Sequence, residues 1–137
     1  MKRNVLLVMP AADRDEMLQV AADGGFAFDS VLTCRGARQA LRAGHKYDVV
    51  VTDLTLCDGN WWSVYLDLAV TGESAEIIVI VPRKAVNVTE ILAHGVHSVL
   101  AQPLDRDQVL RALDSASSRE PEMAGAMAME SSQAQPA

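Results

Sequence analysis

The sequence predicts an α/β fold in which a parallel β-sheet is covered by helices on both faces. Five short apolar segments rich in β-branched residues alternate with five helix-like segments between residues 5 and 116. Three of the apolar segments are hydrophobic nearly throughout rather than at every second position, which is typical of strands buried on both faces. Strands separated by helices run parallel, because each helix returns the chain across the sheet.

The predicted strands are short, as expected for a small sheet. They cover residues 5–9, 29–34, 49–52, 77–81 and 98–101. The first, third and fourth are the continuously apolar ones, so they are expected at the centre of the sheet. For five strands joined in this way we expect a flavodoxin-like (βα)5 arrangement, a doubly wound parallel sheet with strand order 2-1-3-4-5.

The predicted helices begin and end at residues that commonly bound helices. They cover residues 13–25, 36–44, 61–72, 87–95 and 105–116. Asp13 and Asp105 are predicted N-caps, and Asn87 starts a pattern similar to a capping box. All but the last helix are expected to end at glycines, which adopt the left-handed conformation that closes many helices.

Composition excludes several classes of protein. The chain has 137 residues, of which 22% are charged, and a net charge of -6, so a general nucleic-acid or anionic-membrane binder is not expected. No apolar run approaches the ~20 residues of a membrane span. Cys34 and Cys57 form no spaced metal or disulfide framework. We therefore expect a cytoplasmic protein.

The composition changes near the carboxyl terminus. Residues 117–137 contain no Val, Ile, Leu or aromatic residue, so this segment cannot bury enough apolar surface to order itself. We predict one domain, residues 1–116, followed by a disordered tail, residues 117–137.

The carboxyl ends of the predicted strands are where a site is expected, because open parallel sheets bind ligands there. Only one strand, the third, is followed directly by an acid, Asp53. A carboxylate at the end of a buried strand is costly unless it is used or caps the next turn. Asp53 is therefore the first candidate for a functional residue, and capping of the turn is the structural alternative.

Three stretches of the sequence resemble one known family. They are "NVLLVMPAADRDEML" at residues 4–18, "YDVVVTDLTLCDG" at residues 47–59, and "GVHSVLAQPLD" at residues 95–105. Their order and separations resemble the receiver domain of response regulators over residues 3–116. The resemblance implies a signal-transduction module of a two-component (phosphorelay) system, and not an enzyme.

The resemblance also assigns roles to individual positions. Asp53 matches the phosphoacceptor, which in the family works with acids, a hydroxyl residue and a Lys. The acidic pair falls on Met9 and Pro10, the hydroxyl residue on Val81, the Lys on Gln102, and the aromatic switch residue on Val99. The family motif is therefore retained at Asp53 and lost around it.

These departures predict a degenerate site. Mg²⁺ is usually anchored by carboxylates, and here only Asp53 remains, assisted at most by a backbone carbonyl near Thr55. Asp13 is expected to lie too far along the first helix to replace the missing acids. We therefore expect no catalytic residue, no cofactor, and no metal beyond weak Mg²⁺ binding through Asp53.

Three functions remain open. The first is a pseudo-receiver that acts through protein–protein interaction, with a histidine kinase or a downstream regulator as its partner. The second is a working receiver, phosphorylated on Asp53 by a histidine kinase. The third is a flavodoxin-like binder of a small ligand, which is disfavoured because the loop after the first strand lacks the glycines and hydroxyls of a phosphate cradle.

The resemblance further implies an interaction surface. It is built by the fourth helix, the fifth strand and the fifth helix, and includes Val99, Arg106 and Arg111. The same face is expected to support a homodimer if one forms.

Overall fold

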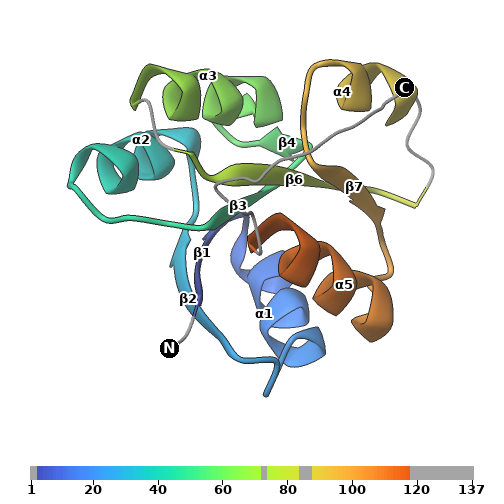
Figure 1. The fold of residues 1–137 in the computed structure, drawn as a ribbon. Coiled ribbons are helices and arrows are strands. Elements are labelled where there is room, and N and C mark those ends of the chain that lie inside the picture. Colours follow the sequence, from blue (N-terminus) through green and yellow to red (C-terminus); the bar gives the residue numbers. More distant parts are fainter. Residues whose placement is uncertain (1–2, 72–73, 84–87, 118–137) are drawn as a thin grey trace, which may run out of the picture.

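The computed structural model describes residues 3–71, 74–83 and 88–117, and it shows a five-stranded parallel sheet (Figure 1). The strands are β1 (Arg3–Val8), β2 (Phe26–Val31), β3 (Val49–Asp53), β6 (Glu76–Val81) and β7 (Ser98–Ala101). Their order is β2-β1-β3-β6-β7, and every pairing between them is parallel. The predicted α/β class and the predicted strand order 2-1-3-4-5 are therefore confirmed.

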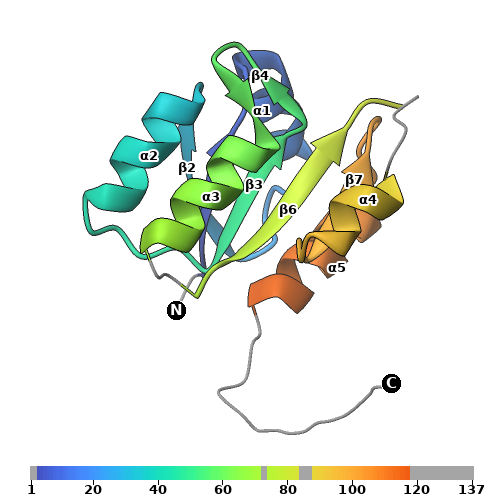
Figure 2. The ribbon, with the colours of Figure 1, turned by 90° about the horizontal axis from the view of Figure 1, so that it is seen from above.

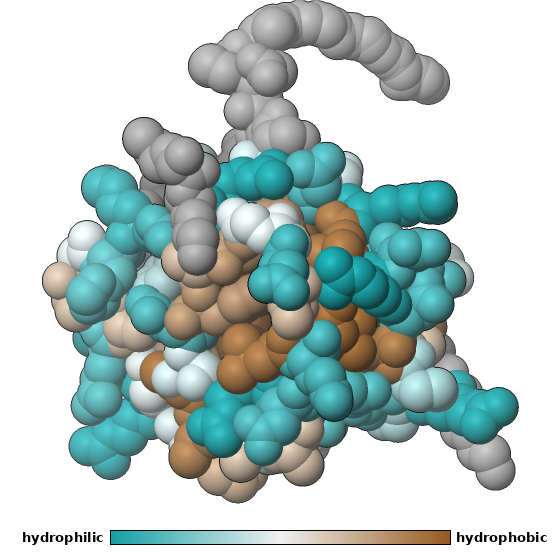
Figure 3. Space-filling model, turned by 90° about the horizontal axis from the view of Figure 1, so that it is seen from below, coloured by the Kyte–Doolittle hydropathy of each residue, from teal (hydrophilic) through white to brown (hydrophobic). Residues whose placement is uncertain are grey.

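Helices cover both faces of the sheet. They are α1 (Ala11–Val20), α2 (Cys34–Arg42), α3 (Trp61–Thr71), α4 (Val88–Ala93) and α5 (Arg106–Ser117). Helices α1 and α5 lie on one face, and α2, α3 and α4 lie on the other (Figures 1 and 2). Figure 3 shows the face built by α1 and α5, where apolar surface gathers in the middle and is surrounded by hydrophilic side chains.

The central strands contribute to two hydrophobic cores. In β1, Val5 and Leu7 pack against α1 and α5, whereas Leu6 and Val8 pack against the opposite helices. All four side chains are fully buried. The continuous apolar runs thus reflect burial on both sides of the sheet, as predicted.

Strand β2 begins and ends three residues earlier than predicted. The prediction of residues 29–34 is wrong because the chain has already left the sheet at Thr33. This residue is the N-cap of α2, and its side-chain oxygen accepts a hydrogen bond from the Gly36 amide at 2.9 Å. Two aromatic residues, Phe26 and Phe28, instead anchor the strand against the α1–α5 core.

Two of the three predicted N-caps, Asp13 and Asp105, lie among the described residues. The prediction of Asp13 as an N-cap is wrong: α1 starts at Ala11, with Pro10 at the N-cap position and no side-chain cap. The prediction for Asp105 is confirmed, because its carboxylate accepts the Gln108 amide hydrogen bond at 3.0 Å. Asn87 and residues 118–137 lie outside the described residues. Among the described helices, none has the length and apolar character needed to cross a membrane.

Candidate functional site

Asp53 lies at the carboxyl end of β3, the central strand of the sheet. Its neighbours in the sheet are the ends of β1 and β6, and the Leu54 amide continues the pairing to the Ile80 carbonyl at 2.9 Å. Although it is an acid, Asp53 is only 8% exposed. The fold thus places a buried carboxyl group where parallel sheets bind ligands.

The residues at the neighbouring strand ends are mostly apolar. Met9 and Val81 are each only 1% exposed, and each packs into one of the two hydrophobic cores. Pro10 is exposed at the start of α1, and Thr55 is exposed in the short strand β4 (Thr55–Leu56). Neither Met9 nor Val81 therefore supplies a side-chain oxygen to the site.

Gln102 supplies the main polar contact between α1 and the end of β7. Its side-chain amide nitrogen donates to Asp13 Oδ1 and to Glu16 Oε1, both at 3.1 Å. The second oxygen of Glu16 accepts a hydrogen bond from the Leu104 amide at 3.0 Å. The Gln102–Pro103 peptide bond is cis. A neutral amide therefore bridges two acidic side chains at the edge of the site.

Asp53 is held by its surroundings as a neutral acid. Burial, together with the hydrogen bonding and charge of Asp13 and the charge of Glu16, raises the pKa of Asp53 to about 8. Within the described part of the chain, its Oδ1 atom is buried and has no hydrogen-bond partner. At neutral pH this pKa favours the protonated form of Asp53, because three carboxyl groups gather here and, in the described residues, no cation lowers the pKa.

Two acidic residues of α1, Asp13 and Glu16, contribute to the surroundings of Asp53, although the sequence did not predict it. Asp13 lies closer to Asp53 than expected, because α1 starts two residues before Asp13 and brings its first turn to the end of β3. That Asp13 does not replace the missing acids as a metal ligand stays a prediction. Glu16 was missed altogether. Its spacing of three residues from Asp13 was the available signal, since residues three apart lie on the same helix face.

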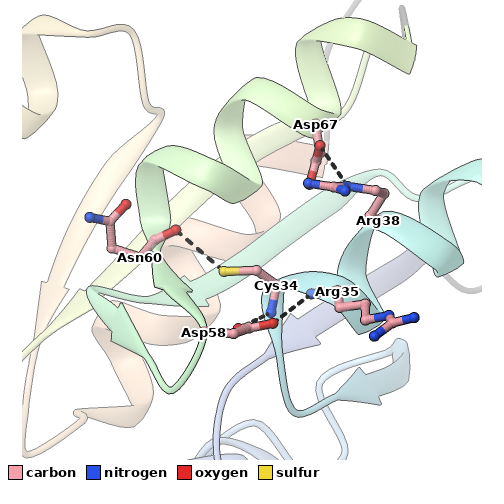
Figure 4. Close-up of polar contacts among 6 residues, drawn as sticks. All are labelled: Cys34, Arg35, Arg38, Asp58, Asn60 and Asp67. Carbon is pink, nitrogen blue, oxygen red and sulfur yellow. Dashed lines mark hydrogen bonds and ion pairs between the residues drawn. The ribbon is translucent and has the colours of Figure 1, made fainter.

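The loop after Asp53 is fixed to α2 by Asp58 (Figure 4). The Asp58 carboxylate accepts hydrogen bonds from the amides of Cys34 and Arg35, at 2.8 and 3.1 Å. These hydrogen bonds lower the pKa of Asp58. The Asp58 side chain thus satisfies two free amides at the start of a helix in another part of the chain.

The same loop forms a short hairpin that the sequence did not predict. Strand β4 pairs antiparallel with β5 (Gly59–Asn60), and α3 follows directly. The Asn60 carbonyl accepts a hydrogen bond from the thiol of Cys34 at 3.7 Å. Cys34 is buried, and burial followed by the nearby Asp58 raises the pKa of its thiol to about 11, so this thiol is not reactive.

Two tryptophans lie next to this loop. The Trp61 amide donates to the carbonyl of Leu54, the residue after Asp53, at 3.1 Å. The Trp61 ring is half-buried, whereas Trp62 is 38% exposed and stacks on Tyr65. The backbone of Trp61 is therefore joined to the residue after Asp53, while its ring packs against Trp62, Tyr65 and His94.

The chain was compared with known proteins. No protein-family model and no curated protein sequence matches it. Among solved structures, the signal receiver domain of a putative LuxO repressor protein from Vibrio parahaemolyticus is 19% identical, with a TM-score of 0.74 over 85% of this chain and 91% of that chain. A response regulator receiver domain protein from Clostridium thermocellum is 11% identical, with a TM-score of 0.76 over 88% and 98%. A response regulator receiver protein from Sinorhizobium medicae is 23% identical, with a TM-score of 0.72 over 85% and 94%.

The chain has the receiver fold. The match extends over nearly the whole of each compared chain, so the likeness is not confined to a common βα unit. At these identities it establishes the architecture, and the chemistry must be judged from the side chains.

A receiver fold raises the question of Mg²⁺, and the side chains near Asp53 fit this ion poorly. Mg²⁺ requires oxygen ligands in near-octahedral geometry. In the described residues, no three His, Cys, Asp or Glu side chains are arranged to hold a metal ion. Asp13 and Glu16 already accept hydrogen bonds from Gln102.

The residues expected at an interaction surface lie in different surroundings on the receiver fold. Val99 is half-buried in β7, and Arg111 is exposed on α5. Arg106 donates to the carbonyls of Val20 and Ala22, at 2.9 and 2.8 Å, and so fastens α5 to the end of α1. A substitution of Arg106 would thus also disturb the packing of these two helices.

Proposed function

We propose that this chain is a pseudo-receiver of two-component signalling that acts through protein–protein contacts and not through phosphotransfer. The observation that carries the proposal is the contact of Gln102 with Asp13 and Glu16. The resemblance expects a Lys at this position. A neutral amide there fills the hydrogen-bonding role without bringing a positive charge to the site.

The chemistry of phosphoryl transfer supports this proposal. Such reactions depend on groups that neutralise the charge of the transferred phosphoryl group. Around Asp53, the side chains of Met9 and Val81 are apolar and buried, and Gln102 is uncharged. A carboxyl group with a pKa of about 8 is also mostly protonated at neutral pH, which makes it a poor nucleophile.

A second candidate is a working receiver phosphorylated on Asp53 by a histidine kinase. It is favoured by the position of Asp53 at the end of β3 and by its buried Oδ1 atom, which has no hydrogen-bond partner among the described residues. A bound cation would supply the missing positive charge and lower the pKa of Asp53. The two candidates therefore differ in whether a cation and a phosphoryl analogue bind.

The test is a titration with Mg²⁺ and beryllofluoride, a phosphoryl analogue, followed by tryptophan fluorescence. For a pseudo-receiver we expect no saturable change up to millimolar Mg²⁺, although Trp61 contacts the residue next to Asp53. Asp53→Asn is the matched control and should give the same trace. A saturable signal in the wild type that is lost in Asp53→Asn would establish the working receiver instead.

The proposed contact surface is the face built by α4, β7 and α5, which also is the proposed homodimer face. Charge reversal of the exposed Arg111 should weaken self-association or partner binding by about tenfold, since rim charges act mainly through electrostatic complementarity. Sedimentation velocity measures the dimer, and pull-down with a cognate kinase measures partner binding. Asp53→Asn should leave both unchanged. Loss of association in Asp53→Asn, with none in Arg111→Glu, would contradict the proposal.

A further inference from the structure

Helix α2 carries a cluster of arginines on its outer side. Arg35, Arg38 and Arg42 are three and four residues apart, so they lie along one face of the helix. Residues 30–47 contain four Arg or Lys residues and no Asp or Glu, although the whole chain has a net charge of -6. The cluster is thus a local basic surface on an acidic protein.

This cluster is not explained by contacts within the protein. Arg38 forms an ion pair with Asp67 at 3.2 Å, but in the described residues neither Arg35 nor Arg42 has an ion pair. Arg42 suits the last turn of α2, whereas Arg35 lies in the first turn, where the helix dipole disfavours a positive charge. Like charges on one helix face also destabilise it. Stability therefore does not account for the arrangement.

The arginines also surround a hollow. A shallow depression of about 430 Å³ is lined by Arg35, Arg38, Arg42, Gln39 and Ala43. Figure 4 shows Arg38 reaching from α2 to Asp67 on α3, while the Arg35 side chain extends away from the Asp58 loop. The guanidinium groups of Arg35 and Arg42, which form no ion pair in the described residues, are thus available to a ligand.

Helix α3, next to α2, exposes an apolar stripe. Trp62, Leu66 and Val70 are 38%, 45% and 75% exposed, and they are spaced four residues apart on the outer side of the helix. Asp67, which pairs with Arg38, lies between Leu66 and Val70 in the sequence. Because Asp67 lies three residues before Val70, the arginines adjoin the Val70 end of the stripe, and we call Arg35, Arg38, Arg42, Trp62, Leu66 and Val70 the α2–α3 surface.

We propose that the α2–α3 surface binds an acidic amphipathic helix of a partner protein. An amphipathic helix binds through apolar anchors at spacings of three and four residues, and Trp62, Leu66 and Val70 on α3 provide their counterpart. Arg35 and Arg42 are two turns apart, about 10 Å along the helix, which matches carboxylates two turns apart on the partner. Arginine is suited to this contact because its planar guanidinium binds carboxylates with two hydrogen bonds.

The charge of the surface and of the whole chain favours an acidic protein segment over a nucleic acid as the ligand. The arginine cluster attracts carboxylates, but the surrounding protein, with its net charge of -6, repels the long, uniformly charged backbone of a nucleic acid. The surface is formed by α2 and α3 and does not involve Asp53 or α5. It is thus independent of the function proposed for the Asp53 site.

The test uses a fluorescein-labelled synthetic helix of about 18 residues with a leucine stripe flanked by glutamates. We expect the labelled peptide to bind the full chain saturably, as measured by fluorescence anisotropy. The double variant Arg35→Glu with Arg42→Glu should weaken this binding at least about tenfold. Arg14→Glu with Arg83→Glu is the control, because it makes the same change in net charge at positions outside α2 and α3. Leu66→Ser with Val70→Ser should weaken binding as well, while the control pair should not.

Several outcomes would overturn the proposal. The proposal is wrong if the peptide fails to bind, if the control pair loses as much peptide binding as the Arg35 and Arg42 pair, or if binding survives both α2–α3 variants. It is also wrong if the same arginines bind a DNA duplex more tightly than the peptide, or if they mediate self-association in sedimentation. Circular dichroism checks that each variant is folded. If the charge reversals unfold the chain, Arg35→Gln with Arg42→Gln removes both charges, and a loss of binding is again expected.

Discussion

Replacement of Asp53 by Asn is expected to stabilise the protein by about 1–3 kcal/mol at pH 8. The native pKa of about 8 lies far above the ordinary value of 3.8, so the folded state binds a proton that the unfolded state releases between these pH values. The stability of the wild type should therefore fall as pH rises from about 4 to about 8. Asn removes the ionisable group and keeps a donor for Asp13, so the gain should be largest at the upper end of this range.

Urea unfolding between pH 5 and pH 8 in the presence of a metal chelator measures this effect. The gain from Asp53→Asn should shrink steadily as pH falls toward 4, because Asp53 is then protonated in both states. Asp107→Asn, at an exposed position on α5, is the control and should change stability little at any pH. A variant less stable than the wild type at pH 8 would show that Asp53 is ionised and stabilised by a partner.

The centre of the fold was predictable because burial on two faces leaves a direct mark on the sequence. Strands β1, β3 and β6 each bury successive side chains in opposite cores, which requires apolar residues at nearly every position. The edge strand β2 has no such requirement, and its burial varies along the strand. Its pattern therefore did not show that the strand begins at Phe26, or that Thr33 already caps the next helix.

The site was predictable at Asp53 and only in part around it. The position of Asp53 follows from the end of a buried strand, which the apolar run defines within a residue. Whether Asp13 and Glu16 lie close to Asp53 depends instead on where α1 begins. The sequence predicted Asp13 as the N-cap, whereas Pro10 occupies that position in the structure. The contact of Asp58 with α2 joins segments 24 residues apart, so it depends on tertiary packing rather than on local pattern.

Gln102→Lys is expected to lower the pKa of Asp53 by about 2 units or more from its value of about 8. An ammonium group in place of the amide would lie beside Asp13 and Glu16, and it would bring a positive charge toward the buried Oδ1 atom of Asp53. An opposite charge nearby favours the ionised carboxylate. The fall in stability between pH 4 and pH 8 should then become smaller, and Asp53→Asn should stabilise the protein less than it does beside Gln102.

Carboxyl carbon NMR of Asp53 during a pH titration measures the shift directly, and the double variant Gln102→Lys with Asp53→Asn measures the coupling. Gln102→Met is the matched control. It preserves the length of the side chain but has no donor, so it should leave the pKa of Asp53 as high as in the wild type or raise it further. An unchanged pKa in Gln102→Lys would mean that the ammonium group pairs with Asp13 and Glu16 alone. The neutral state of Asp53 would then follow from burial, the largest cause of its raised pKa, and not from the missing positive charge.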